Sequence, residues 1–463
     1  MEEISLSETQ SICPECFAVV PAWRIGRGDR IFLKKSCPEH GSHETVIWRG
    51  SPAFSSWVSP KTPSYPENPS TLVEKGCPLD CGLCAKHRQH TCTALIEVTQ
   101  RCNLHCAFCF AGAGNKPACD PTLEDLREQF DRLLAVAGPC NVQLSGGEPT
   151  LRDDLPEIVA MGLSRGFSFI QINTNGLRLA NDPSYVKALK DAGVASVFLQ
   201  FDGMEDSVYL RIRGRELLRE KRLAIEHCAG YGLGVVVVAT IVPGINTGQI
   251  GPIIEFAFQG LPTIRGVHFQ PVSYFGRYPS PPEDENRITI PEIITAIETQ
   301  TGARLRAEHF KPPGCENALC SFHGNFVLLT DGTVLPWTQH QSKDCGCKPI
   351  LATDGAAKSR RFVTQFWSGP KEMQIPCAGG QIHSLGAWDE FLNRVPTHSL
   401  CISGMAFQDA WNLDLERLKD CCIHVVHPDG RLIPFCAYNI TDSEGRSYYR
   451  DKGFGRGSTG EAA

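Results

Sequence analysis

Cysteine constrains this chain more than any other residue type, because 22 of the 463 residues are cysteines and most of them fall in short groups. That content is too sparse for a small disulfide scaffold and high for an ordinary enzyme. The acidic first residues contain no apolar segment, so we predict no secretory signal. We expect a cytoplasmic protein, in which disulfides are rare and metal binding is the leading use for the thiols.

Composition and charge exclude several classes of protein. A hydrophobic content of 42% and a charged content of 21% are typical of a globular chain, and the net charge of −6 gives no reason to expect nucleic acid as a partner. The most apolar run, residues 235–242, is far too short to span a membrane. Peripheral contact with the inner face of a membrane stays compatible with the sequence.

The amino-terminal 50 residues carry two candidate metal knuckles. Cys13 and Cys16 form the first, and Cys37 and His40 form the second, each with proline and glutamate between its two ligands. Four soft or imidazole ligands suit tetrahedral zinc or a rubredoxin-like iron. We therefore predict a zinc-knuckle or rubredoxin-like module over residues 1–50, with buried free thiols as the alternative.

Residues 51–93 combine a proline-rich linker with a second cysteine group. Its members are Cys77, Cys81, Cys84 and Cys92, of which the first three follow the spacing C-x3-C-x2-C. Short spacings with glycine and proline let one loop wrap an iron–sulfur cube, for which Cys92 is a candidate fourth ligand. The alternative is a zinc loop completed by His87 or His90.

The third cysteine group follows a strand-like run that starts at residue 94. Cys102, Cys106 and Cys109 again have the spacing C-x3-C-x2-C. Three thiolates can hold three irons of a [4Fe–4S] cube and leave the fourth iron without a protein ligand. An iron with an open position can bind a small chelating ligand.

Five further apolar runs follow, near residues 141, 169, 196, 235 and 266, and helical stretches separate them. Buried strands that alternate with helices predict an α/β fold with a parallel sheet. The carboxyl ends of such strands face one site. The candidates at these ends are Ser145, Gly146, Gly147, Glu148 and Pro149, then Thr174 and Asn175, then Gln200 and Asp202. Glycines admit a close approach to the backbone, and Glu148 can accept a hydrogen bond from an ammonium group.

Residues 94–280 resemble the core of the radical S-adenosylmethionine (SAM) superfamily, a partial (β/α)6 barrel. Cys102, Cys106 and Cys109 match its cluster motif, and residues 145–149 match its methionine-binding motif. The resemblance implies that SAM binds the open iron and is cleaved to a 5′-deoxyadenosyl radical. It also implies that Gly146, Gly147 and Glu148 hold the methionine end of SAM. Thr174, Asn175, Gln200 and Asp202 would lie near its ribose.

The region 281–463 holds nine cysteines and two Asp-Gly hairpins, near residues 331 and 429. We predict that it is an extension with an auxiliary iron–sulfur cluster, as many radical SAM enzymes have. The candidate ligands are Cys422 and Cys436, then Cys315 and Cys320. Cys421 and Cys422 would point apart in an extended segment, so one of them can be a bystander. The alternative is that several of these cysteines are inert buried thiols. The expected fold is thus a radical SAM barrel with small cysteine-rich metal-binding modules at both ends.

Over nearly its full length the chain resembles the archaeal tetraether lipid synthases, a family earlier interpreted as methyltransferases of a dihydropterin. The synthase resemblance implies carbon–carbon coupling between lipid alkyl chains, one or two auxiliary [4Fe–4S] clusters, and an external electron donor of the ferredoxin or flavodoxin type. The alternatives are methylation of a dihydropterin or similar small molecule, and a non-catalytic iron–sulfur protein. The sequence does not separate a lipid substrate from a small heterocycle.

Overall fold

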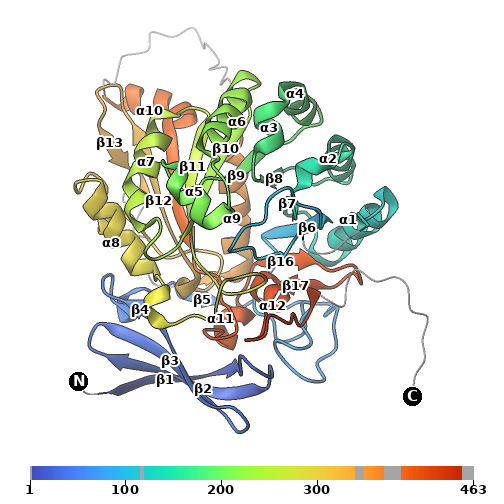
Figure 1. The fold of residues 1–463 in the computed structure, drawn as a ribbon, viewed down its shortest axis with the longest axis vertical. Coiled ribbons are helices and arrows are strands. Elements are labelled where there is room, and N and C mark those ends of the chain that lie inside the picture. Colours follow the sequence, from blue (N-terminus) through green and yellow to red (C-terminus); the bar gives the residue numbers. More distant parts are fainter. Residues whose placement is uncertain (1–2, 115–118, 339–348, 370–386, 451–463) are drawn as a thin grey trace.

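The computed structural model describes residues 3–114, 119–338, 349–369 and 387–450. Its centre is a curved sheet in which six parallel strands stand in sequence order (Figure 1). These strands are β6 (Thr93–Thr99), β7 (Asn141–Gly146), β8 (Ile170–Thr174), β9 (Ser196–Gln200), β10 (Gly234–Ile241) and β11 (Ile264–Pro271). All six were expected from the apolar runs, and the partial (β/α)6 barrel is confirmed.

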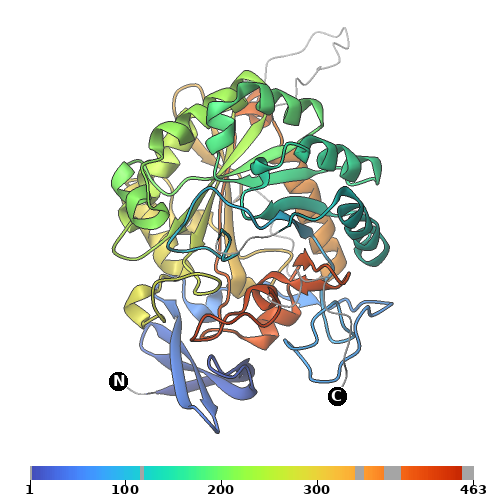
Figure 2. The same cartoon turned by 45° about the vertical axis from the view of Figure 1, so that its right-hand side comes forward.

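Helices form an outer layer around the strands (Figure 2). They are α1 (Leu123–Ala137), α2 (Leu155–Ser164), α3 (Leu177–Asn181), α4 (Pro183–Asp191), α5 (Asp206–Arg213), α6 (Leu218–Gly230), α7 (Ile250–Gln259) and α8 (Ile290–Gln300). A capping box between Thr122 and Asp125 starts α1. Fully buried Leu126 and Phe130 on α1 belong to the same core as Ile96 and Val142 on the strands.

The carboxy-terminal region extends both edges of this sheet. β15 (Ser399–Met405) pairs in parallel with β11, and β16 (Ile423–Val426) pairs in parallel with β6. β12 (Ser321–Leu328) with β13 (Val334–Pro336), and β16 with β17 (Leu432–Pro434), are the two expected hairpins. The sequence suggested a small module, but the extension shares the barrel's own sheet, because the open edges of β6 and β11 supply unpaired backbone groups.

The remaining helices of the extension are α9 (Ala352–Phe366), α10 (Ala387–His398), α11 (Leu415–Lys419) and α12 (Phe435–Asn439). Two-residue strands join the linker to this region, because β5 (Lys61–Thr62) pairs with β14 (Ile350–Leu351). Of the helices that the structure describes, none has the length and apolar character that a membrane crossing needs.

The amino-terminal module is a four-stranded antiparallel sheet below the barrel in Figure 1. It consists of β1 (Ile4–Ile12), β2 (Val19–Arg27), β3 (Arg30–Cys37) and β4 (Gly41–Arg49). Polar contacts fix it to the extension: Arg24 forms an ion pair with Asp414 at 2.6 Å, and the Lys35 ammonium donates to the Ala410 carbonyl at 2.7 Å.

A buried ion pair connects the segment after the barrel to the extension, and it supplies a test of this packing. Both guanidinium nitrogens of Arg287 lie 2.9 Å from Asp409, whose side chain is fully buried and also accepts from the Tyr274 N–H. We expect Asp409→Ala to lower the free energy of unfolding by about 3–5 kcal/mol, since it leaves Arg287 buried without its partner. Chemical denaturation measures this change.

The matched control is Asp191→Ala, which breaks the exposed pair between Lys187 and Asp191. This control should cost less than about 1 kcal/mol. Equal losses in the two variants would contradict a structural role for the buried pair.

Candidate functional site

The interior of the barrel is a single cavity of about 970 Å³. Its wall includes Gly146 and Thr174 at the carboxyl ends of the strands and Asn141 and Phe169 at the opposite ends. The cavity therefore runs the height of the barrel. Three predicted sets of residues meet in it: the third cysteine group, part of the glycine motif, and two of the other cysteines predicted to bind metal, Cys92 and Cys422.

Cys102, Cys106 and Cys109 all line one end of the cavity. Their loop follows β6 directly and is held by backbone contacts. The Ala107 N–H donates to the Ile212 carbonyl at 2.9 Å, and Cys109 exchanges two 2.9 Å backbone hydrogen bonds with Arg277. The Arg277 guanidinium also donates to the Cys106 carbonyl at 2.7 Å. The loop thus presents its three thiols to one space.

The electrostatics of these thiols fit a bound cluster. Burial raises the pKa of the Cys102 thiol to about 12, and the Glu148 carboxylate and the other two thiols act in the same direction. Without metal the Cys102 thiol would stay protonated at pH 7. Iron would bind the three cysteines as thiolates, because a bound cation reverses the local pKa logic. The residues present therefore fit a three-cysteine iron–sulfur cluster.

Gly146 and Gly147 let the next loop pack against this one. A Cβ atom at Gly146, whose φ is +118°, would lie 2.1 Å from the Thr99 carbonyl oxygen, and one at Gly147 would lie 2.1 Å from the Arg101 carbonyl oxygen. The N–H groups of Gly147 and Glu148 donate to these carbonyls, each at 2.8 Å. The sequence suggested that the glycines admit a ligand. The structure shows that they first admit the backbone that precedes the cysteines.

The Glu148 carboxylate joins the carboxyl ends of β7 and β8. Its Oε1 accepts from the hydroxyls of Thr150 and Thr174, each at 2.6 Å, and from the Thr150 N–H. Its Oε2 accepts from the Asn175 N–H at 2.7 Å. A carboxylate offers about four acceptor positions, so Oε2 retains capacity for an ammonium group. Because Glu148 also lines the cavity, it fits the amino end of SAM.

The other predicted cofactor residues differ in position. Thr174, Asn175 and Gln200 line the cavity, whereas Ser145, Pro149 and Asp202 are not part of its described wall. The Asp202 carboxylate is fully buried and binds Arg213 through two 2.8 Å hydrogen bonds. The structure thus places Asp202 behind the wall and Arg213 on it. Sequence reasoning missed Arg213, since it lies on α5 and not at a strand end.

A second cysteine site lies elsewhere on the same cavity. The sulfur atoms of Cys92, Cys315 and Cys422 all lie within 4.8 Å of one another, and all three residues are buried. Cys92 and Cys422 line the cavity. We expected Cys92 to join the loop of Cys77, but the pairing of β16 with β6 brings the Cys92 N–H to 2.8 Å from the Cys422 carbonyl.

The remaining candidate cysteines can be grouped by whether they lie near Cys421 or near Cys422. The Cys77 thiol hydrogen-bonds to Cys81, which lowers the pKa of Cys77. Burial raises the pKa of Cys421, and the nearby Cys436 and Cys320 act in the same direction. The hydrogen bond to Cys77 and burial raise the pKa of Cys81 well above its ordinary value. The nearby Cys84 and Cys421 raise it further. Cys320 and Cys436 therefore lie near Cys421. Neither belongs to the three-cysteine group that contains Cys422.

The amino-terminal knuckles meet as predicted. His40 Nδ1 lies 3.6 Å from the Cys13 sulfur and 3.5 Å from the Cys37 sulfur, and the sulfurs of Cys16 and Cys37 are 3.9 Å apart. A tetrahedral zinc with Zn–S bonds of about 2.3 Å separates its ligands by roughly such distances. The hydrogen bond from His40 lowers the pKa of Cys37 to about 6. These four residues fit one bound metal ion.

Comparison with known proteins agrees with this geometry. The family model of the radical SAM superfamily matches residues 96–257, and that of the HMPTM N-terminal zinc ribbon domain matches residues 5–49. A protein of Methanocaldococcus jannaschii named 7,8-dihydro-6-hydroxymethylpterin dimethyltransferase is 34% identical over 476 residues, which cover 93% of each chain. The chain belongs to the family of this relative, within the radical SAM superfamily.

Other proteins match smaller parts of the chain. The probable GTP 3′,8-cyclase of Methanothermobacter marburgensis is 34% identical over 174 residues, 37% of this chain and 56% of that one. The solved structure of anSMEcpe with bound AdoMet is 19% identical, with a TM-score of 0.36, over 45% of this chain and 60% of that one. The match to the radical SAM family model agrees with the expectation of a SAM-binding [4Fe–4S] cluster, and the zinc ribbon match agrees with an added metal site at the amino terminus.

The packing of the glycine motif on the cysteine loop predicts the effect of one methyl group in this radical SAM enzyme. Gly147→Ala should displace the loop and lower SAM cleavage by about a hundredfold, because small misplacements cost that much in rate. Cleavage to 5′-deoxyadenosine, measured by liquid chromatography, checks this. Gly230→Ala is the control, since its Cβ meets nothing within 4 Å. Full activity in Gly147→Ala would refute the close packing.

The second cysteine site predicts a loss of metal. Cys422→Ser should remove up to about four irons per reconstituted chain if the site holds a cube. Iron analysis and the cluster absorbance measure it. Cys228→Ser is the control, because Cys228 is buried and burial alone raises its pKa. An unchanged iron content in Cys422→Ser would show that the three thiols hold no iron.

Proposed function

We propose that this radical SAM enzyme forms carbon–carbon bonds at unactivated alkyl carbons of a substrate with long apolar chains, as lipid coupling requires. The observation that carries the proposal is an aromatic lobe of the cavity beside the Cys109 loop. Phe110, Phe275 and Phe407 surround Phe435, at ring distances of 5.5, 6.1 and 4.5 Å. All four rings line the cavity, as do Cys109 and Cys422. An alkyl segment in this lobe would lie against aromatic rings.

The chain's own residues prepare the site for this chemistry. Cys102, Cys106 and Cys109 would hold the cluster, and Glu148 would hold the amino end of SAM. SAM bound there supplies, after one-electron reduction, a primary-carbon radical strong enough to remove hydrogen from an alkyl group. Phe435 and its neighbours would orient the chain and exclude water, so that an alkyl group of the substrate lies within reach of the radical. Coupling two alkyl positions would consume two SAM and two electrons, for which we propose a ferredoxin or flavodoxin donor.

The second cysteine site supports the same proposal. Cys92, Cys315 and Cys422 would hold an auxiliary cluster, a store for electrons. Ile423, next to Cys422, lines the cavity together with the aromatic rings. A chain in the lobe would therefore lie between two metal centres. We propose two auxiliary clusters in total, the other one on the side of Cys421 with Cys320 and Cys436.

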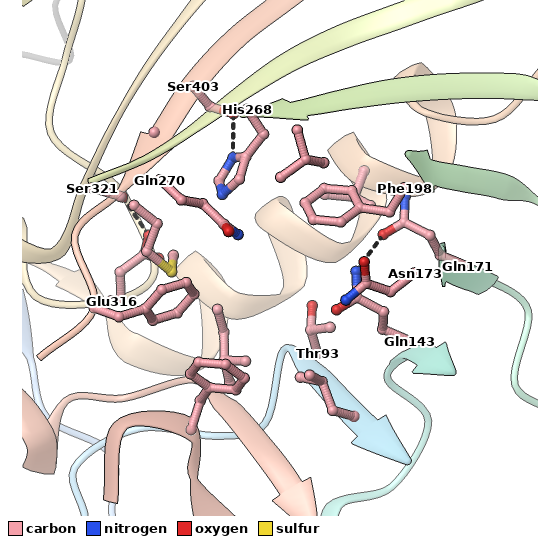
Figure 3. Close-up of a pocket in the computed structure, with 18 of the residues that line it drawn as sticks. Thr93, Gln143, Gln171, Asn173, Phe198, His268, Gln270, Glu316, Ser321 and Ser403 are labelled. Atoms are coloured by element: carbon pink, nitrogen blue, oxygen red, sulfur yellow. Dashed lines mark hydrogen bonds between the residues drawn. The ribbon is translucent and has the colours of Figure 1, made fainter. Parts of the chain in front are cut away.

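Methylation of a dihydropterin is the second candidate, and a different part of the wall favours it. Gln143, Gln171 and Asn173 form a row of amides on β7 and β8, opposite Gln270 and His268 on β11 (Figure 3). Gln143 donates to Gln171 at 3.0 Å. Amides can recognise the edge of a heterocycle, and the M. jannaschii relative is named for such a substrate. The length of the cavity and its aromatic lobe exceed what one bicyclic ring needs.

One experiment separates the two functions. The gene is expressed in a host that makes long-chain diether lipids, and extracted lipids and pterins are analysed by mass spectrometry. We expect fused alkyl chains that carry two hydrogens fewer per new bond. Cys106→Ala is the inactive control. A methylated pterin without fused lipids would favour the second candidate, and absence of SAM cleavage in the reconstituted protein would contradict both.

A further inference from the structure

Among the described residues of the cavity wall, four are exposed to solvent: Lys311, Gly314, Ile350 and Lys358. We call the part of the wall that they form the mouth of the cavity. The segment 311–314 and helix α9 supply three of these four residues. The two parts are packed tightly, because a Cβ atom at Gly355 on α9 would lie 2.2 Å from the Gly314 carbonyl oxygen. The mouth is therefore a built feature in which two lysines have fixed backbone positions.

Apart from the two lysines, the described wall offers no unmatched cation. Arg213 is matched by Asp202 through two 2.8 Å hydrogen bonds. Burial lowers the pKa of both His268 and His323 to about 4, so these rings are neutral at pH 7. The other polar groups of the described wall are the Glu148 and Glu316 carboxylates, the thiols, amides and hydroxyls, none of which is a cation. An anionic group on a substrate would therefore find no unmatched cation there.

The lysines at the mouth are different. The structure gives neither Lys311 nor Lys358 a carboxylate within 4 Å among the described residues. Two exposed ammonium groups at one opening attract an anion, and ammonium is a common partner of phosphate. Ile350, just before α9, and Phe362, one turn after Lys358 on α9, also line the cavity, so an apolar segment can follow the anion inward.

We propose that Lys311 and Lys358 form an anion subsite that holds the phosphate-type headgroup of an amphiphilic substrate while its chain enters past Ile350 and Phe362. The inference rests on the proposed function for the chain-binding lobe and adds where the head of the substrate lies. The wall places the second cysteine site between this mouth and the aromatic lobe, since Glu316, Cys92 and Cys422 line the cavity near segment 311–314 and α9. A substrate held by its head thus passes this site before it reaches Phe435.

The test measures binding to the reconstituted full chain. The probe is decyl phosphate below its micelle concentration, and uncharged decanol is the comparison ligand; calorimetry gives both dissociation constants. The wild type should bind decyl phosphate, and the double variant Lys311→Gln/Lys358→Gln should bind it about tenfold more weakly, the loss expected for removing two charged partners. Decanol binding should be unchanged. The charge-preserving variant Lys311→Arg/Lys358→Arg should retain decyl phosphate binding.

The matched control is Arg361→Gln, which removes one positive charge from the exposed surface of the same helix but not from the described cavity wall. It should bind decyl phosphate as the wild type does. Failure of the wild type to bind, equal binding by the glutamine double variant, or an equal loss of decanol binding would overturn the subsite. Binding of inorganic phosphate or GTP as tight as that of decyl phosphate would also overturn it, because the site would then recognise free phosphate and not an amphiphile.

This result is independent of the proposed function. If the wild type binds decyl phosphate through the lysines but produces no fused lipid chains, the coupling proposal fails and the subsite stands. If fused chains form and the lysine variants bind as the wild type does, the subsite fails and the coupling proposal stands.

Discussion

The parallel pairing of β16 with β6 is the contact on which the rest of the site depends. β6 leads directly into the Cys102 loop, and β16 follows directly after Cys422. One backbone contact thus places the end of the chain beside the start of the barrel. It brings Cys422 to Cys92, and through the hairpin to β17 it brings Phe435 against Phe110. Without it, the barrel would keep its cysteine loop but lose one wall and the three-cysteine site of Cys92, Cys315 and Cys422.

A buried ionic network reinforces this contact. Glu97 on β6 accepts from both terminal nitrogens of Arg450, at 2.7 and 3.0 Å, and from the Tyr438 hydroxyl at 3.2 Å. Arg450 also donates to the Asn439 side chain at 2.6 Å. Burying two charges is costly unless both groups are fully hydrogen-bonded. Here the carboxylate and the guanidinium each have more than one hydrogen-bond partner. The network therefore stabilises one specific placement of the extension over the cysteine loop.

The sequence was informative where chemistry is local. The spacing of Cys102, Cys106 and Cys109, the six apolar runs and the two Asp-Gly hairpins each depend on residues close in the chain, and all correspond to features of the structure. Contacts across long separations were not readable. Cys92 and Cys422 are 330 residues apart, and only strand pairing shows that they are neighbours. Arg213 was equally hidden, because its position on the wall depends on how α5 packs against the Cys106 loop.

The distribution of polarity in the cavity limits which substrates it can hold. A carboxylate or phosphate in the middle of the barrel would lose its hydration and meet neutral imidazoles and amides, a cost of several kcal/mol. The apolar rings around Phe435 would reject such a group more strongly. An amphiphile with its charge at the mouth and its chain inside meets neither penalty. The row of amides at Gln143 would then face SAM or uncharged polar atoms of the substrate. The amides can hydrogen-bond to such atoms without leaving a buried charge unpaired. The arrangement would thus order an amphiphilic substrate of the proposed kind by polarity from the mouth to the cysteine loop.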